Sequence, residues 1–373
     1  MPESTVPPAP KERIIAIDAL RGFDMFWITG GQGIVLGLAA LLCGGHAPEW
    51  VRYQLEHPAW TGFTAWDMIM PTFLFLAGAS MPFSIAVEKE RGVPLSRIFV
   101  RIGRRVVLLW ILGMIAQGNL LSSLSSMDFS RLRLYSNTLQ SIASGYVIAS
   151  LGVLFLSLRQ QIALCAGLLV LFWGLMMFLP FGGNPAGTLE PRLNLALHVD
   201  EVLLGRFRDG TSYTWILSSI AFGGTVLLGV FAGGILKSPR SHQEKLRSLV
   251  ILAVGLLVGG QLWGLHFPII KHIWTSSMVL WAGGWSVAAL AFFFWVLDMR
   301  GWRRGSKVFI VVGANAILAY MLGEEWVSFV EDLFDKFVKQ ESQVMGGVAS
   351  LIAFVTMYLA LSVLYRKKIF VRV

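Results

Sequence analysis

His57 and Asp67 are the residues of this chain best suited to chemistry, because they stand at the start of an apolar run, His57–Gly78, that predicts a membrane-spanning helix. Ionisable groups are costly at such a position, so they indicate function. The imidazole of His57 titrates near neutral pH, which suits a general base or a nucleophile. Asp67 is placed to orient that imidazole or to pair with an arginine. The structural alternatives are a loop histidine that caps a helix and an ion pair that only fixes helix packing.

The elements that must position these residues are transmembrane helices. The chain has 373 residues, of which 55% are hydrophobic and only 14% are charged. Its mean hydropathy is +0.66, whereas a soluble domain carries about 25% charged residues. Apolar runs recur at about the 20-residue length that crosses a bilayer as a helix, and they lack the short alternating pattern of barrel strands. We therefore expect an all-α, polytopic membrane helix bundle.

About ten spans are predicted, in a single transmembrane domain over residues 14–373 that follows a tail at 1–13. The third and ninth predicted spans are the weakest, because one is interrupted by polar residues and the other is short. In chain order the predicted spans are Phe23–Leu42, Phe63–Val87, Val106–Leu121, Leu139–Leu158, Ile162–Leu179, Trp215–Leu236, Leu249–Leu265, Met278–Leu297, Val308–Leu322 and Gly347–Leu364.

The distribution of basic residues predicts the orientation. Both ends of the chain and every second connection between spans lie on one side of the membrane, and they hold 22 of the 31 lysines and arginines. The remaining connections, on the opposite side, hold 9. Cytoplasmic loops are enriched in these residues, so both termini are expected in the cytoplasm. His57, the long connection Phe181–Thr211 and the acidic stretch Glu324–Glu341 then face the extracytoplasmic side. The net charge of +9 thus reflects insertion topology, and no nucleic-acid partner is expected.

Two groups of charged residues mark the cytoplasmic side. Asp18 and Arg21 are spaced to share one helix face, as a ligand site or as an exposed ion pair. A dense arginine cluster follows the second span, and arginine suits phosphate binding. The alternative for this cluster is anchoring of the helix and contact with anionic lipid. The cluster consists of Arg97, Arg101, Arg104 and Arg105.

Other polar residues stand within or beside later spans. Gln140 and Asn315 need partners there, either on a neighbouring helix or in a pocket. Lys271 and Trp274 lie at the outer end of the eighth span, where a tryptophan is also typical of the interfacial belt. The histidines and the two cysteines show no metal-ligand spacing, so no metal site is expected.

Several of these residues form motifs that resemble the heparan-α-glucosaminide N-acetyltransferase family. The most specific block runs from His57-Pro-Ala-Trp-Thr-Gly to Asp67 and Pro71, and Asp18-Ala-Leu-Arg21-Gly precedes it. The resemblance covers nearly the whole chain. Further similar segments are Leu139-Gln140 to Tyr146, Lys271-His-Ile-Trp274-Thr275, and Gly313-Ala-Asn315 to Tyr320 with Glu324.

The resemblance implies a transmembrane acyltransferase that moves an acetyl group from cytosolic acetyl-CoA to an extracytoplasmic amino sugar or other glycan. The family's catalytic histidine falls on His57, and Asp67 is expected to raise the basicity of its imidazole or to fix its tautomer. Gln32 stands where the lysosomal member has an asparagine near the active site. The residues expected to bind the donor are Arg21, Gln32, Arg101, Arg104 and Arg105. Those expected to bind substrate are Asp18, Gln140, Lys271, Trp274, Asn315 and Glu324.

Several alternatives stay open from the sequence. The acyl group can pass directly to the acceptor or through an acyl-histidine, and the product can be an amide or an ester. A bacterial inner membrane, contact with membrane lipid and, by analogy with the lysosomal enzyme, a homodimer are expected. A transporter of sugars or small acidic metabolites is the main competing function, because embedded polar residues suit it too. A purely structural membrane protein is the third.

Overall fold

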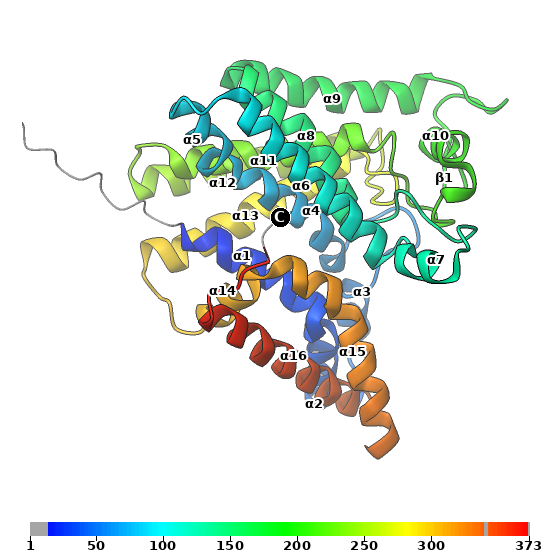
Figure 1. Ribbon diagram of the computed structural model, residues 1–373, viewed down its shortest axis with the longest axis vertical. Coiled ribbons are helices and arrows are strands. Elements are labelled where there is room, and N and C mark those ends of the chain that lie inside the picture. The colour runs from blue at the N-terminus through cyan, green and yellow to red at the C-terminus, as the bar shows by residue number, and fades with distance from the viewer. Residues whose placement is uncertain (1–13, 339–341, 372–373) are drawn as a thin grey trace, which may run out of the picture.

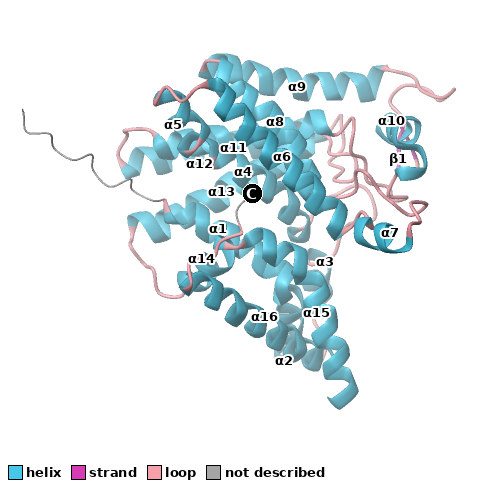
Figure 2. Ribbon diagram, viewed as in Figure 1, coloured by secondary structure: helices cyan, strands magenta, loops and turns pink. Residues whose placement is uncertain are grey.

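The computed structural model describes residues 14–338 and 342–371. The predicted tail at 1–13 lies outside the described residues, as does Glu341 at the end of the predicted acidic stretch. The described chain is an all-α bundle, as predicted, and its only paired strands are the two-residue β1 (Leu189–Glu190) and β2 (Leu193–Asn194). Figure 1 shows the long helices stacked across one another, and in Figure 2 the larger group of loops lies at the right, near α7 and α10, with shorter loops at the left.

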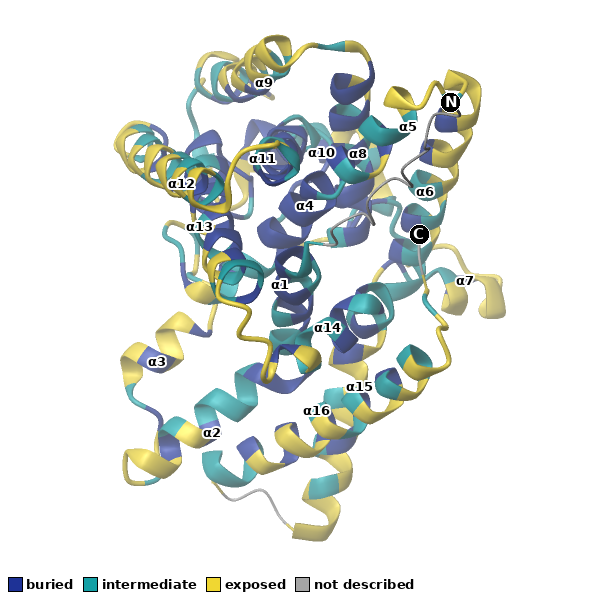
Figure 3. Cartoon of the chain, turned by 90° about the vertical axis from the view of Figure 1, so that its left-hand side faces the viewer, coloured by how far each residue is buried: buried dark blue, intermediate teal, exposed yellow. Residues whose placement is uncertain are grey.

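The most buried helices form the centre of the bundle, and more exposed helices surround them (Figure 3). In the most apolar stretch of the candidate span that contains α4, 72% of the residues are buried, against 17% in that of α12. The central helices are α1 (Ile15–Phe26), α4 (Ile69–Ala79), α8 (Thr138–Phe155), α11 (Ser219–Lys237) and α13 (Ser276–Phe293). The outer long helices are α2 (Gln32–Leu42), α6 (Leu95–Ala116), α9 (Leu158–Phe178), α12 (His242–Gly264), α14 (Ser306–Ala314), α15 (Ala316–Val338) and α16 (Gln343–Arg366). Short helices complete the connections: α3 (Glu49–Gln54), α5 (Ile85–Glu90), α7 (Leu120–Ser126) and α10 (Leu195–Leu204).

Small residues let the central helices touch backbone to backbone. A Cβ atom on Gly78 of α4 would overlap the carbonyl group of Val226 on α11, and one on Gly229 of α11 would overlap that of Phe75 on α4. This packing resembles the close glycine contacts of other membrane helix pairs, where van der Waals contact replaces the hydrophobic effect. It fixes α4, which directly follows the turn that carries Asp67, within the bundle.

The structure contains eight helices that are long and apolar enough to span a membrane among the described residues, or nine if α14 and α15 are one broken span. Two of the ten predicted spans therefore need correction. The third was placed at Val106–Leu121, but α6 begins at Leu95 and ends at Ala116, and Asn119 has a left-handed backbone (φ 58°). The first half of α6 carries the arginine cluster, which lowers its apolar character.

The ninth predicted span, Val308–Leu322, is not one straight helix. It breaks at Asn315, and α14 and α15 meet there at 96°. Its short apolar run did not reveal this break. The first span is longer than predicted and covers Ile15–Leu42, with a kink at Thr29 and Gly30.

Candidate active site

His57, Asp67 and Lys271 come together at the end of the bundle that is predicted to be extracytoplasmic. The Nδ1 atom of His57 lies 2.6 Å from Oδ1 of Asp67. The Nζ atom of Lys271 lies 3.3 Å from the same oxygen and 3.5 Å from His57 Nδ1. The side chain of Asp67 is 1% exposed, whereas that of His57 is 40% exposed. One buried carboxylate therefore holds a partly open imidazole and an ammonium group.

A helix cap holds Asp67 in this orientation. Thr64 is the N-cap of η2 (Ala65–Met68), the short turn that precedes α4, and Asp67 is its third residue. Asp67 Oδ2 accepts hydrogen bonds from the backbone nitrogen and the hydroxyl group of Thr64, at 3.0 and 3.3 Å. This reciprocal capping box satisfies donors at the helix start. The other carboxylate oxygen of Asp67, Oδ1, is thereby left to face His57 and Lys271.

Lys271 approaches from the loop between α12 and α13. Its side chain is 8% exposed, and this burial lowers its pKa, while Asp67 acts in the opposite direction. Trp274 anchors the same loop, because its ring is buried and its Nε1 donates to Thr225 Oγ1 on α11 at 3.0 Å. Trp274, predicted to bind substrate, is thus placed in the protein core behind Lys271.

A cavity of about 480 Å³ opens beside His57. Lys271 and Glu324, both predicted from the sequence, also line it. The structure adds residues that sequence reasoning did not place in the site, contributed by segments that are remote along the chain. They are Trp66, Arg133, Asn137, Asp209 and Tyr213. Tyr320 of α15, part of a motif noted in the sequence, lines the cavity too. The length of the connection Phe181–Thr211 was the one signal pointing to Asp209.

His272 is a further residue beside this cavity that was not predicted. Its ring stacks on Trp60 at 5.2 Å and packs against Tyr213 at 4.3 Å, between ring centroids. Burial, followed by the charge of Lys271, lowers the pKa of His272 to about 4. Its imidazole is therefore neutral near pH 7, which keeps a second positive charge away from Lys271.

A second cavity, of about 430 Å³, lies toward the other end of the bundle. Asp18, Arg21 and Arg105 line it together. Arg21 donates to Ser80 Oγ at 3.0 Å and pairs with Asp18 at 3.5 Å. The guanidinium of Arg105 lies 4.2 Å from the ring centroid of Tyr146, and its buried Nε has no hydrogen-bond partner in the described chain.

The two cavities follow one another along the same three helices. On α4, Ile69 and Met70 line the first cavity, and Phe73 lines the second. The helices α8 and α15 likewise contribute to both. At the boundary the rings of Phe73 and Tyr320 lie 6.3 Å apart. One aromatic side chain from the lining of each cavity therefore stands between the two cavities.

Comparison with known proteins gives two similar sequences. The chain is 27% identical to human heparan-α-glucosaminide N-acetyltransferase over 409 aligned positions, which cover 94% of this chain and 59% of the human protein. It is 25% identical to the mouse protein of the same name, over 97% of this chain and 61% of that protein. The chain is therefore similar, over nearly its whole length, to two heparan-α-glucosaminide N-acetyltransferases. The resemblance read from the motifs is thus confirmed, although no family model matches the chain. The chain spans about three fifths of the length of these relatives.

The remaining predicted donor-binding residues are dispersed. Arg101 pairs with Glu88, and Arg104 is exposed on α6. Neither belongs to the described lining of the cavity that holds Arg105. Gln32 lies at the other end of the bundle, where its Nε2 donates to the Leu55 carbonyl oxygen at 2.7 Å. Gln32 therefore holds the loop that leads to His57.

Two predicted substrate-binding residues hold backbone segments. The Gln140 side chain accepts from Ser136 N at 2.8 Å and donates to the Leu134 carbonyl oxygen at 2.6 Å. It thereby fixes the loop that presents Ser136 to the His57 cavity. Asn315 Oδ1 accepts from the backbone nitrogen of Val371 at 2.8 Å, and its Nδ2 donates to the Ile369 carbonyl oxygen at 3.2 Å. The break between α14 and α15 therefore binds the C-terminal segment.

Proposed function

We propose that this protein is a membrane acetyltransferase that moves an acetyl group from cytosolic acetyl-CoA to an amino sugar or another glycan on the far side of the membrane. The observation that carries the proposal is the buried Asp67 carboxylate, which binds His57 Nδ1 at 2.6 Å beside an open cavity. The names of the two relatives support the same reaction class.

His57 is the proposed general base. A carboxylate on Nδ1 favours the tautomer with its proton on Nδ1, which leaves Nε2 free to accept a proton. In a direct transfer, His57 takes a proton from the acceptor amine or hydroxyl as that atom attacks the thioester carbonyl. The carbon–sulfur bond then breaks, and the proton passes to the CoA thiolate. Lys271 and Asp67 act by positioning and by holding the imidazole.

The donor is proposed to bind at the second cavity. Arg21 and Arg105 are the arginines brought together there, and the unpartnered Nε of Arg105 is suited to a phosphate oxygen. The acetylated arm would pass between Phe73 and Tyr320 to reach His57. The acceptor would enter from the opposite end, where Glu324 lines the cavity and can bind a cationic amine. The bacterial inner-membrane location and the homodimer are part of this proposal.

Acetyl transfer tests the proposal directly. We expect purified protein in nanodiscs to acetylate glucosamine or a methyl glucosaminide from radiolabelled acetyl-CoA. His57→Ala should abolish transfer, whereas His46→Ala, which alters an exposed histidine of the same side, should not. A thermal shift with acetyl-CoA and CoA, but not ATP, should accompany activity, since a ligand at a hundred times its Kd stabilises by about 2.7 kcal/mol.

The outcome also separates the competing functions. A transporter would carry sugar across proteoliposomes without a shift by CoA and without dependence on His57 as a base. The two chemical routes differ in CoA release before an acceptor is added. An acetyl-histidine intermediate predicts a burst of one equivalent of CoA, and direct transfer predicts none.

A further inference from the structure

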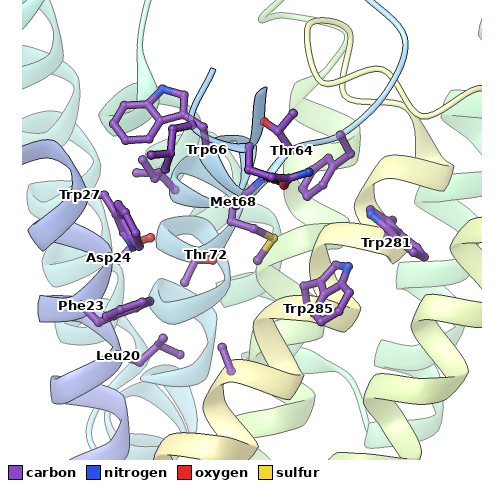
Figure 4. A pocket seen from close by; sticks show the side chains of 16 residues that line it. Leu20, Phe23, Asp24, Trp27, Thr64, Trp66, Met68, Thr72, Trp281 and Trp285 are labelled. Carbon is purple, nitrogen blue, oxygen red and sulfur yellow. Dashed lines mark hydrogen bonds between the residues drawn. The ribbon is translucent and has the colours of Figure 1, made fainter. Parts of the chain in front are cut away.

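A third cavity, of about 510 Å³, lies between α1, α4 and α13 (Figure 4). Its walls are almost entirely apolar and aromatic. Four tryptophans line it, namely Trp27, Trp66, Trp281 and Trp285. It extends along α13 from Trp281 to Ala289, a rise of about 12 Å at 1.5 Å per residue. The cavity is thus large enough for an extended hydrocarbon segment and, at this volume, falls in the range of ligand pockets.

One carboxyl group interrupts these apolar walls. Asp24 of α1 is 4% exposed and lines the cavity, and Figure 4 shows it facing Met68 and Thr72 across the space. Its Oδ2 has no hydrogen-bond partner in the described part of the chain. Buried polar groups are nearly always hydrogen-bonded, and an unsatisfied one is costly. The cavity therefore presents an acceptor that suits a ligand with a hydroxyl or amide donor.

The cavity adjoins the proposed catalytic site. Trp66 and Ile69 line both this cavity and the one that contains His57, and Thr64, which caps Asp67, forms part of its outer end. The cavity also reaches the outer surface of the bundle, because Trp285 on α13 is 46% exposed. Since α13 is a candidate membrane span, we expect that surface to face lipid. A ligand in the membrane can therefore enter sideways and lie next to His57.

We propose that this cavity binds the hydrocarbon chain of a lipid-borne acceptor, with Asp24 accepting a hydrogen bond from a hydroxyl or amide group where the chain joins the polar head. The head then passes Trp66 to reach His57. This inference rests on the proposed acetyl transfer, and it adds that the acceptor is an amphipathic glycolipid-like molecule and not a free sugar. The hydrocarbon chain partitions from the bilayer into the cavity. The acceptor amine or hydroxyl group therefore reaches His57 by lateral diffusion within the membrane.

The test compares dodecyl glucosaminide with methyl glucosaminide as acceptors, in nanodiscs that contain no alkyl glycoside detergent. We expect kcat/KM to be at least tenfold higher for the dodecyl acceptor. Ala289→Trp, which fills the deep end of the cavity, should lower the ratio of the two kcat/KM values at least tenfold. Ala288→Trp, the same change at the neighbouring position outside the described lining, should leave the ratio unchanged. Asp24→Leu should lower the ratio in the same direction as Ala289→Trp.

Binding is measured separately from activity. A diazirine placed at the end of the dodecyl chain should label peptides from α1, α4 and α13, and Ala289→Trp should reduce that labelling at least fivefold. Labelling without transfer to either acceptor would leave the lipid site standing and refute the acetyl transfer. Transfer at equal efficiency to both acceptors, without labelling, would overturn the lipid proposal alone. If Ala289→Trp instead impairs use of decanoyl-CoA relative to acetyl-CoA, the cavity holds the donor chain, and the proposal is wrong.

Discussion

The exchange Asp67→Asn is the sharpest test of the proposed site, because it keeps the shape of the side chain and removes its charge. An asparagine that retains the hydrogen bond from the Thr64 nitrogen, now 3.0 Å to Oδ2, must turn its amide group toward His57 and Lys271. The part of the amide that then faces them is its NH2 group, which donates hydrogen bonds and cannot accept them. It opposes the Lys271 ammonium and favours the His57 tautomer with its proton on Nε2. The variant therefore loses both the counter-charge and the base.

Both losses can be given a magnitude. At 3.3 Å and an effective dielectric constant of about 20, the attraction between Asp67 and Lys271 is about 5 kcal/mol. Desolvation offsets part of this in the native protein, but removal of one partner of a buried pair still costs about 3–5 kcal/mol. Deprotonation of Lys271 limits this cost at high pH. The wrong tautomer lowers the rate of transfer by about 10³–10⁴-fold, as for an aspartate that orients a histidine base elsewhere.

The assay combines thermal unfolding in nanodiscs with acetyl transfer. We expect Asp67→Asn to lower the melting temperature and to abolish most transfer. Addition of Lys271→Met to Asp67→Asn should restore stability, because no buried charge is then unpaired, but it should not restore transfer. The difference in stability between Asp67→Asn and wild type should narrow from pH 6.5 to 9. In the variant the folded state disfavours the charged form of Lys271, so its unfolded state binds more protons and its stability rises with pH. Transfer within tenfold of wild type in Asp67→Asn would refute the reasoning.

Three further predictions concern residues around the site. Arg105→Lys should raise KM for acetyl-CoA about tenfold, because lysine lacks the planar fork and the stacking on Tyr146, and the exposed Arg104→Lys is the control; equal effects of the two would contradict a donor site at Arg105. The pKa of His272 is lowered to about 4, so the unfolded chain binds more protons between about pH 4 and 6.5, and stability conferred by the neutral ring is lost as pH falls through that window. His272→Phe should therefore lose less stability than wild type between pH 7 and 5 in melting experiments; a parallel loss would show that His272 does not titrate there. Gln32→Ala should cost about 1 kcal/mol for its lost hydrogen bond and lower kcat with little change in the KM for acetyl-CoA, whereas a selective rise in that KM would place Gln32 at the donor.

The fold class and most spans could be predicted because lipid demands long apolar helices with every backbone group paired. The errors lie where local polarity and tertiary contacts decide. The first half of α6 is amphipathic and carries arginines, so only its apolar second half was predicted as a span, and the whole helix is not among the candidate spans of the described chain. The 96° break at Asn315 depends on a side chain that binds the returning C-terminal segment, a contact between residues more than fifty positions apart.

The candidate site could be predicted only where its members are close in sequence. His57 and Asp67 share one loop and helix start, and their spacing places both at the same end of the bundle. Lys271 was predicted to lie at the outer end of its span, but its pairing with Asp67 bridges 204 positions, which no spacing reveals. His272 looked like one of several loop histidines. Its neutral, stacked state follows from Trp60 and Tyr213, which come from two other loops.

The shared ion pair has a geometric consequence that outweighs its contribution to stability. Buried pairs contribute little net stability, since desolvation opposes their attraction. Here the pair joins the loop before α13 to the start of α4, and Gly62 N donates to the Ile269 carbonyl oxygen at 3.0 Å within the same contact. The loop before α13 and the segment before α4, which are far apart in the sequence, are thereby held at a fixed separation beside His57. In Lys271→Met the Asp67 carboxylate keeps its hydrogen bonds from His57 and Thr64, so this variant loses less stability than Asp67→Asn. We therefore expect Lys271→Met alone to impair transfer more than folding, with a lower kcat. A melting temperature that falls in proportion to activity would show that Lys271 serves stability and not the placement of His57.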